Sequence, residues 1–276
     1  RLVRASADWV VLPDDGEWKL EVAQKGRLDK FVATAAAVEP LSAGAVRLEV
    51  KAAGVNFRDV LNALGMVPIA WLGLEVAGVV TEVGEGVEHV RVGQKVLGMG
   101  QATFSSMTVA DGRLLTPMPE NLSFEEGATI PLVFLTAWYA LKDLGNLKKG
   151  EKILIHAAAG GVGMAAVQMA KMIGAEIYGT ASEPKWDTLR DMGLDHAHIA
   201  SSRTLDFEGS FGAHVGEGKF DFVLNALARE FVDANFRLLN GGGRFLEMGK
   251  TDIREADWVE KNHPGIYYNA FDLMEA

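Results

Sequence analysis

An apolar strand that runs into a glycine turn and a small-residue helix constrains the fold of this chain more than any other segment. Residues 153–163 read Ile-Leu-Ile-His-Ala-Ala-Ala-Gly-Gly-Val-Gly. The pyrophosphate of a dinucleotide is bound by backbone N–H groups at a helix N-terminus, where no Cβ blocks the approach. Gly160 permits that approach, and Gly163 lets the helix lie close to the sheet. The expected pyrophosphate contacts are the residues of this turn: Gly160, Gly161, Val162 and Gly163.

The match to the usual dinucleotide fingerprint is a variant, because Ala158 stands where its first glycine is expected. A tight strand-to-helix turn without any ligand is the alternative interpretation of the same residues. The strand before the turn and the second strand after the helix favour nucleotide binding.

The end of the second strand favours NADP over NAD. Enzymes that use NAD place an acid there, roughly 20 residues after the glycines, to bind the ribose 2′-hydroxyl. In this chain Ser182 and Lys185 follow the strand and suit a 2′-phosphate, with Arg203 as a second cation. Glu183 is contrary evidence, although the proline after it is expected to turn it away. An ordinary solvated Lys185 is the alternative.

The two halves of the chain differ in pattern, which predicts two domains in an α/β protein. Short β-type runs punctuated by glycine, such as 45–50, 76–83 and 94–97, are typical of a compact β-barrel. From Ser123, a plausible N-cap, strands alternate with helices, which builds a doubly wound parallel sheet. Pro131 predicts a break between two helices. The expected strands lie at 152–156, 176–180, 220–224 and 244–248, and the expected helices at 162–173, 185–192 and 233–239.

Composition limits the partners and sites of this chain of 276 residues. No cysteine is present, so no disulfide, thiolate nucleophile or cysteine–zinc site can form. A net charge of −10 argues against a nucleic-acid partner, which needs a basic face. The apolar stretch 153–170 contains His156 and a glycine pair, so we expect no membrane span. Residues 1–13 lack a signal-peptide pattern, and a cytoplasmic setting is expected.

Several long motifs outside the glycine turn follow one another in a fixed order. They read Gly-Val-Asn-Phe-Arg-Asp-Val over 54–60, Val-Phe-Leu-Thr-Ala-Trp-Tyr-Ala-Leu over 133–141, Lys-Trp-Asp-Thr-Leu over 185–189, Ile-Ala-Ser-Ser-Arg-Thr-Leu-Asp-Phe over 199–207 and Phe-Leu-Glu-Met-Gly-Lys-Thr-Asp-Ile-Arg over 245–254. With these motifs the chain resembles the enoyl reductase domains of modular polyketide synthases, which belong to the zinc-free medium-chain dehydrogenase/reductase superfamily.

The resemblance implies a domain arrangement. Residues 1–122 correspond to a GroES-like β-barrel that binds substrate, with its C-terminal return partly missing. Residues 123–262 correspond to a Rossmann domain that binds NADPH, and residues 263–276 begin the return towards the substrate domain.

The segment 73–78 decides the zinc question within this resemblance. It reads Gly-Leu-Glu-Val-Ala-Gly, where zinc alcohol dehydrogenases of the superfamily have Gly-His-Glu-x-x-Gly. Leu74 therefore replaces a zinc ligand, and a catalytic zinc needs three protein ligands. We expect no metal, and we expect Glu75 to be structural.

The resemblance also implies a reaction. Hydride from NADPH adds to the β-carbon of an enoyl thioester on an acyl carrier protein, in a synthase with neighbouring domains such as a ketoreductase. Donors must meet the charge that develops on the thioester oxygen. The family's candidate groups for protonating the α-carbon fall on Lys250 and Asp272. A desolvated lysine can act as an acid at neutral pH. The alternative is a structural Lys250, with water as the proton source.

Other family positions complete the expected site. Phe57 stands where the family often has tyrosine and cannot donate a proton, so the expected product of a 2-methyl-enoyl thioester is 2R. Ala226 replaces the usual serine, which leaves Asn225 as the better cofactor contact. The remaining expected cofactor contacts are Asn56, Thr136, Met248 and Gly249.

Three alternatives stay open. The chain could be a stand-alone NADPH:quinone oxidoreductase, a nucleotide-binding protein without catalysis, or a reductase whose enolate expels a leaving group to close a ring. The motifs at 185–189 and 199–203 favour the synthase domain over the first alternative.

Overall fold

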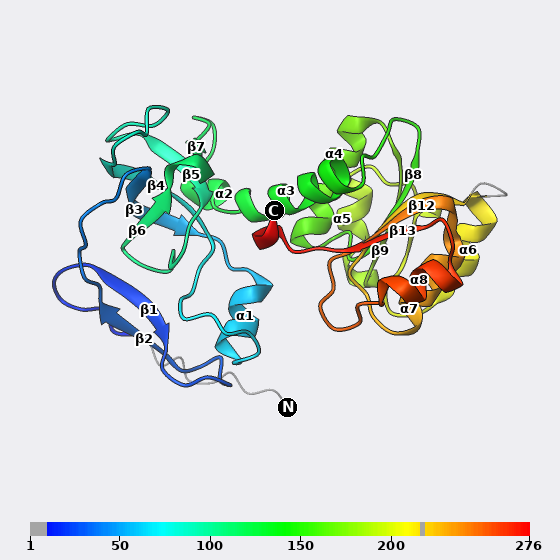
Figure 1. The fold of residues 1–276 in the computed structure, drawn as a ribbon, viewed down its shortest axis with the longest axis horizontal. Helices are drawn as coiled ribbons and strands as arrows, with labels where there is room; N and C mark the ends of the chain where they lie inside the picture. The colour runs from blue at the N-terminus through cyan, green and yellow to red at the C-terminus, as the bar shows by residue number, and fades with distance from the viewer. Residues whose placement is uncertain (1–9, 216–218) are drawn as a thin grey trace. The chain divides into compact units, whose positions relative to one another are not determined.

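The computed structural model describes residues 10–215 and 219–276, and residues 1–9 of the expected first domain lie outside the described residues. The described residues form two compact units, of which the first ends at Leu132 and the second begins at Val133. The main sheet of each unit is separate from that of the other (Figure 1). Each unit also has its own hydrophobic core.

An antiparallel five-stranded sheet is the centre of the first unit. Its strands are β3 (Ala45–Ala53), β4 (Glu75–Val83), β5 (Lys95–Met99), β6 (Met107–Asp111) and β7 (Leu115–Pro117). Their spatial order is β6-β3-β4-β5-β7. Val46 and Leu48, which point to one face of β3, pack with Val76, Val80 and Val96 in the core. The three strands expected in this half are confirmed.

Two smaller elements complete the first unit. An antiparallel hairpin is formed by β1 (Trp18–Val22) and β2 (Phe31–Ala35). Helix α1 (Phe57–Ala63) begins after Asn56, whose backbone N–H donates to the carboxylate of Asp59. The loop before α1 is thereby fixed to its first turn.

The division between the units falls later than the boundary after residue 122 that the sequence indicates. Helix α2 (Phe124–Gly127) packs against β3 and β4 of the first unit, which accounts for the difference. Ser123 caps α2, since its hydroxyl accepts the N–H of Glu126 at 3.2 Å. Helix α3 (Pro131–Trp138) begins at its proline, so the expected break between two helices is confirmed.

A six-stranded parallel sheet is the centre of the second unit. Its strands are β8 (Lys152–Ile155), β9 (Glu176–Ala181), β10 (Ile199–Ser201), β11 (Phe220–Asn225), β12 (Leu239–Glu247) and β13 (Tyr267–Ala270). The main helices are α4 (Gly161–Ile173), α5 (Trp186–Asp191), α6 (Asp206–Val215), α7 (Glu230–Leu238) and α8 (Ala256–Asn262). All strand pairs are parallel, and the expected doubly wound sheet is confirmed.

Side chains of β8 show that both faces of this sheet are buried. Ile153 and Ile155 enter one core cluster, which includes residues of α4. Leu154, between them, enters a second cluster with residues of α6 and α7. Because successive strand residues point to opposite faces, a strand covered on both sides needs a continuous apolar run.

The strand order positions the functional site. It reads β10-β9-β8-β11-β12-β13, so the chain reverses its direction of travel between β8 and β11. Ligands of such sheets bind outside the carboxyl ends of the strands at this reversal. The glycine turn follows β8 there.

The last strand of the sheet comes from the C-terminal segment. Residues 267–270 lie in β13, which pairs with β12, and the expectation that residues 263–276 begin a return towards the first domain stays a prediction. Tyr268 packs against Phe236 and Phe245, which ties this strand to the second unit. Strand β10 and helices α6 and α8 are also absent from the expected elements.

Candidate functional site

The turn between β8 and α4 presents backbone N–H groups at a helix N-terminus. The first helical bond runs from the N–H of Met164 to the carbonyl oxygen of Gly160, at 2.8 Å, so the three preceding N–H groups have no helical partner. A Cβ at Gly163 would lie 2.3 Å from the carbonyl oxygen of Ala157, so only glycine fits there. Ala157 itself is left-handed, with φ of 50°. This turn fits a pyrophosphate.

The residues expected at the 2′-phosphate leave two neighbouring strands. Ala181 pairs with Ser201, and the N–H of Ser202 donates to the carbonyl oxygen of Ala181 at 3.0 Å. Ser182 and Arg203 therefore begin adjacent loops. Lys185 and Arg203 are exposed. A hydroxyl and two cations at one corner suit a phosphate monoester.

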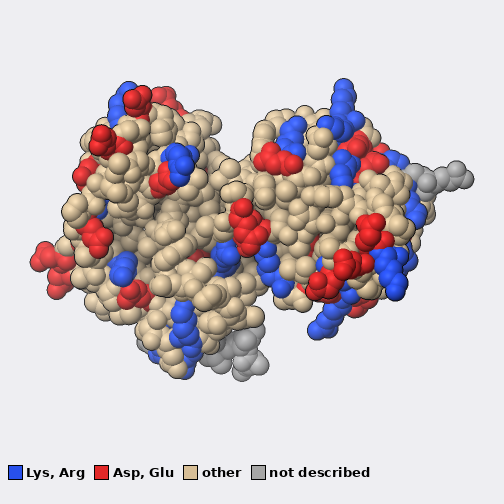
Figure 2. All heavy atoms as spheres, viewed as in Figure 1, with Lys and Arg blue, Asp and Glu red and all other residues tan. Residues whose placement is uncertain are grey.

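Charged side chains are distributed over the surface without a single dominant sign on one face. On the face shown in Figure 2, acidic and basic side chains are interspersed over both units. The net charge of −10 is thus not gathered into one field on that face. Recognition of a charged ligand must come from local groups there.

The two residues expected to handle the proton lie together. Lys250 Nζ is 3.4 Å from the Oδ2 atom of Asp272 and donates to the carbonyl oxygen of Phe271 at 2.6 Å. They follow the neighbouring strands β12 and β13. The Lys250 side chain is 48% exposed and lies beside a carboxylate. Its desolvation beside a cofactor stays a prediction.

A buried carboxylate lies at the base of this pair. Glu247, the last residue of β12, is 1% exposed. Its Oε1 atom accepts the N–H of Gly249 at 2.6 Å, and its Oε2 atom accepts the amide of Asn225 at 2.5 Å. Burial raises the pKa of Glu247 to about 7, against the opposing effect of these hydrogen bonds. The sequence analysis did not identify this residue.

Further buried polar side chains continue from Asn225 across the sheet. Asn235 Nδ2 donates to Asn225 Oδ1 at 3.1 Å, and Asn235 Oδ1 lies 2.7 Å from His156 Nε2. The other ring nitrogen of His156 lies 2.8 Å from the hydroxyl of Thr180. Burial lowers the pKa of His156 to about 4, so the ring is neutral at pH 7. A polar residue that ends an apolar strand, such as His156 or Glu247, is the signal that could have revealed them.

The first unit holds two other expected site residues, Asn56 and Phe57. Asn56 is 8% exposed, and its amide donates to Glu75 Oε1 at 3.0 Å. Glu75 Oε2 accepts the N–H of Leu132 at 2.9 Å, and burial raises the pKa of Glu75. Glu75 thus joins segments of the first unit, in agreement with a structural role. Phe57, the first residue of α1, is 74% exposed.

The other expected contacts belong to the second unit. Thr136 is half-buried on α3. Asn225 is fully buried, and its amide donates within the protein, to Glu247 and to the carbonyl oxygen of Leu227. The N–H of Met248 donates to the carbonyl oxygen of Asn225 at 2.9 Å. The Asn225 side chain therefore orders the loops after β11 and β12.

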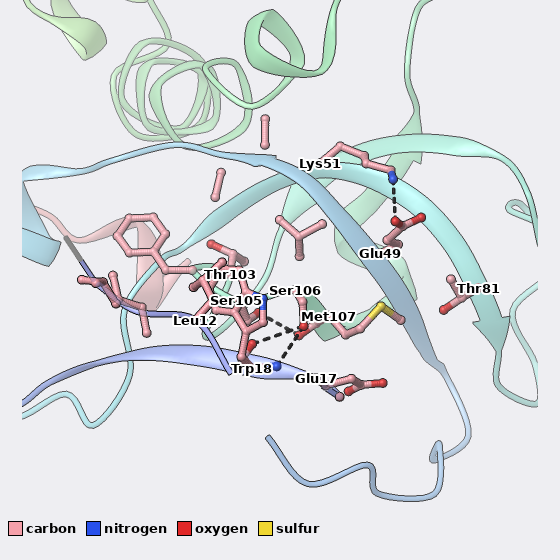
Figure 3. Close-up of a pocket in the computed structure, with 17 residues that line it drawn as sticks. Leu12, Glu17, Trp18, Glu49, Lys51, Thr81, Thr103, Ser105, Ser106 and Met107 are labelled. Carbon is pink, nitrogen blue, oxygen red and sulfur yellow. Dashed lines mark hydrogen bonds and ion pairs between the residues drawn. The ribbon is translucent and has the colours of Figure 1, made fainter. Parts of the chain in front are cut away.

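A cavity of about 740 Å³ lies within the first unit, beside β1 and β3 (Figure 3). Ser106 Oγ accepts the N–H of Trp18 at one side of it, and Lys51 pairs with Glu49 at another. None of the expected site residues contributes to its lining.

Residues 10–215 and 219–276 contain no group of three His, Cys, Asp or Glu side chains that could hold a metal ion. Leu74, at the position of a zinc ligand, is buried at 2% exposure. No helix in the same residues is long and apolar enough to cross a membrane.

Comparison with family models places a known domain type on each unit. The alcohol dehydrogenase GroES-like domain matches residues 42–120. The model described as zinc-binding dehydrogenase matches residues 161–266.

Individual relatives agree with these matches. The pikromycin polyketide synthase component PikAII of Streptomyces venezuelae is 55% identical over 94% of this chain, which spans 7% of the relative's length. The crystal structure of CurK enoyl reductase is 39% identical with a TM-score of 0.90, over 95% of this chain and 82% of that one. The Escherichia coli quinone oxidoreductase complexed with NADPH is 26% identical with a TM-score of 0.81, over 94% and 82% of the two chains.

Proposed function

The chain belongs to the enoyl reductase family of medium-chain dehydrogenase/reductases, and from this premise we propose that it reduces the α,β-double bond of an enoyl thioester with NADPH. One observation carries the proposal. The glycine turn, the phosphate-binding residues and the Lys250–Asp272 pair all follow the carboxyl ends of strands in a single parallel sheet. Such an edge can hold a dinucleotide and present a proton donor beside it.

The choice of NADPH rests on the corner formed by Ser182, Lys185 and Arg203. The fold accounts for binding of a nicotinamide cofactor, and the 2′-phosphate is the group that distinguishes NADPH from NADH. Charge-assisted hydrogen bonds contribute about 1.5–3 kcal/mol each, so even one favours NADPH by about tenfold. The same corner has no buried acid that would bind a free 2′-hydroxyl, since Glu183 is exposed.

The residues of this chain supply the proton part of the reaction. When bound, the reduced nicotinamide supplies a hydride to the β-carbon. The negative charge then resides on the thioester oxygen and α-carbon, and Lys250 is the proposed donor that meets it. An N–H bond of the Lys250 ammonium breaks as a C–H bond forms at the α-carbon. Asp272 holds the ammonium in place and favours its reprotonation from solvent.

The remaining expected residues have supporting roles in the proposal. Gly160, Gly161, Val162 and Gly163 bind the pyrophosphate through backbone N–H groups. Thr136, Met248 and Gly249 are proposed nicotinamide contacts in the second unit, and Asn56 is proposed as a contact from the first. The side chain of Asn225 acts through the loops it orders.

The setting of the reaction is also a proposal. The PikAII relative is a component of a polyketide synthase, and this chain spans only a small part of it. We infer that an acyl carrier protein presents the enoyl chain on phosphopantetheine, and that a ketoreductase is among the neighbouring domains.

Oxidation of NADPH with a crotonyl-pantetheine thioester tests the proposal, with a quinone as the competing acceptor. Rapid oxidation that depends on the thioester is the expected result. Oxidation by the quinone alone would identify a quinone oxidoreductase. Binding of NADPH without oxidation by either acceptor would identify a nucleotide-binding protein.

A further inference from the structure

Five buried polar side chains, named here the Glu247 network, take no part in the steps above. They are Glu247, Asn225, Asn235, His156 and Thr180, and each is at most 1% exposed. They come from the carboxyl ends of β8, β9, β11 and β12 and from α7. Burying this many polar groups is costly unless all are hydrogen-bonded, and every one of them has a partner.

The backbone fixes the direction of every hydrogen bond in this network. The N–H of Leu227 donates to Asn225 Oδ1 at 3.2 Å, and the carbonyl oxygen of Leu227 accepts from Asn225 Nδ2 at 2.7 Å. A backbone N–H cannot accept and a carbonyl cannot donate, so the Asn225 amide has one orientation. Asn235 must then donate to Asn225 Oδ1 and turn its own oxygen towards His156.

This direction determines the tautomer of His156. An oxygen faces its Nε2 atom, so Nε2 must carry the proton. The ring is neutral, so Nδ1 is an acceptor and the Thr180 hydroxyl donates to it. The network therefore runs with a single polarity from Thr180 to the carboxylate of Glu247.

At its other end the network reaches both members of the proton-handling pair. The Glu247 carboxylate holds the N–H of Gly249, the residue before Lys250. The carbonyl oxygen of Glu247 accepts the N–H of Phe271 at 3.1 Å, and Phe271 precedes Asp272. Lys250 Nζ donates to the carbonyl oxygen of Phe271. One residue thus holds the backbone on both sides of the pair.

We propose that the Glu247 network is a positioning device, in which ionised Glu247 holds the turn that carries Lys250 at the distance from Asp272 that proton transfer requires. The proposal rests on the reductase function proposed above and assigns to it a residue that does not touch substrate. Both oxygens of Glu247 accept from fixed donors, and a charged carboxylate is the stronger acceptor for both contacts. Protonation weakens the two hydrogen bonds, because the oxygens of a neutral carboxyl group are poorer acceptors.

The network consequently gives the proton transfer a pH dependence. The pKa of Glu247 is about 7, and the charged or titratable groups that face it are Lys250, Asp252 and Tyr268. As pH falls through this value, the hold on Gly249 weakens. We expect kcat to fall with it and the KM for NADPH to rise by less, because the glycine turn still binds the pyrophosphate even though Gly249 is a proposed nicotinamide contact.

Glu247→Gln tests the catalytic end, with Glu255→Gln as the matched control on the exposed loop before α8. In Glu247→Gln an amide N–H must face a donor, so we expect kcat to fall about tenfold or more, with the KM for NADPH rising by a smaller factor than kcat falls. The acidic limb of the wild-type kcat profile should be absent from this variant. The control should keep both the rate and the profile. A Glu247→Gln enzyme with wild-type kcat and profile would overturn the proposal.

Ring ¹⁵N spectra of the wild-type chain test the network even if the variant does not fold. His156 should show one protonated and one bare nitrogen, unchanged from about pH 5.5 to about pH 8. The Gly249 amide resonance should titrate with Glu247, and Asn235→Ala should change both signals. A ring protonated on Nδ1, or one that titrates near its ordinary pKa, would contradict the network. These spectra need no turnover, so they separate failure of the network from failure of the proposed reaction.

Discussion

Two buried glutamates, one in each unit, are held by the same kinds of donor and serve different ends. Glu75 accepts an asparagine amide, from Asn56, and a backbone N–H, from Leu132. Glu247 accepts an asparagine amide, from Asn225, and a backbone N–H, from Gly249. Burial raises the pKa of both. The chemistry of the carboxylate alone does not distinguish a structural group from a functional one.

The difference lies in what each glutamate holds. Glu75 joins β4 to the start of α1 and to the last residue of the first unit. Glu247 instead holds the turn before Lys250. The side chain of its asparagine partner, Asn225, makes three other polar contacts. A buried acid is therefore best interpreted by the backbone segment that it fixes.

Removing the pair at the end of the Glu247 network should have the largest effect. Lys250→Ala and Asp272→Ala should each retain part of the rate, and the double variant should lose more. A positioned acid contributes about 10²–10⁴-fold, and less where water substitutes. Single-turnover reduction of a crotonyl thioester measures the loss. A double variant as fast as the parent would make both residues bystanders and would remove the contrast with Glu75.

Two buried groups of the second unit should change its free energy of unfolding in opposite directions as pH falls. The folded pKa of His156 is depressed from 6.5 to about 4, so its contribution is present above 6.5 and lost as pH falls to 4. That of Glu247 is raised from 4.5 to about 7, so its contribution is present below 4.5 and lost as pH rises to 7. The two oppose each other within the second unit.

Glu247→Gln should therefore expose the histidine term. Between about pH 6.5 and 4 the second unit should lose on the order of 2–3 kcal/mol more than the parent, at about 1.4 kcal/mol per pKa unit. Hydrogen exchange of the buried amides in β8 and β11 reports this unit alone. Glu75→Gln should leave those amides unchanged. An equal pH dependence of the unfolding free energy in the parent and in Glu247→Gln would show that Glu247 does not offset the contribution of His156.

A smaller effect is expected at the opposite edge of the parallel sheet, where substitutions should change cofactor binding. Lys185→Ala with Arg203→Ala should raise the KM for NADPH by about tenfold or more and barely change that for NADH, because only the 2′-phosphate differs. Steady-state kinetics with both cofactors measures it. Equal losses with the two cofactors would remove the basis for choosing NADPH.

Phe57, a residue of the first unit, is expected to influence the stereochemistry of the product. A phenyl ring fills space and donates no proton, so a 2-methyl-enoyl thioester should yield mainly the 2R product. Phe57→Tyr should shift the ratio towards 2S, because a phenol can donate from its own face of the enolate. Chiral analysis of the reduced thioester gives the ratio. A mainly 2S product from the parent would mean that the first unit's residues do not govern the stereochemistry as expected.

The parts of the fold that depend on residues close together in the sequence were predicted. The glycine turn, the capped helix at Ser123 and the alternation around Ile153 depend on neighbours in sequence. The Glu247 network could not be predicted this way, since it joins residues from four strands and a helix whose pairing is decided by packing. Strand β13 is also absent from the predicted strands, since Tyr268 packs against Phe236 and Phe245, which are distant in sequence.

The residues of the Lys250–Asp272 pair could be predicted from the sequence, but the exposure of Lys250 could not. A resemblance named Lys250 and Asp272, and the structure brings them to 3.4 Å. The Lys250 side chain is 48% exposed, and sequence alone did not indicate this exposure. Burial of a single side chain depends on the whole fold and has no local signature.

Reduction of a crotonyl thioester with NADPH that carries deuterium at the transferred position tests the central claim most directly. We expect deuterium on the β-carbon of the product and a proton from solvent on its α-carbon. When the reaction is run in deuterated water, Lys250→Ala should slow the appearance of deuterium at the α-carbon. Reduced product without deuterium at the β-carbon, or no reduced product at all while a quinone is consumed, would contradict the assignment of this chain as an enoyl-thioester reductase.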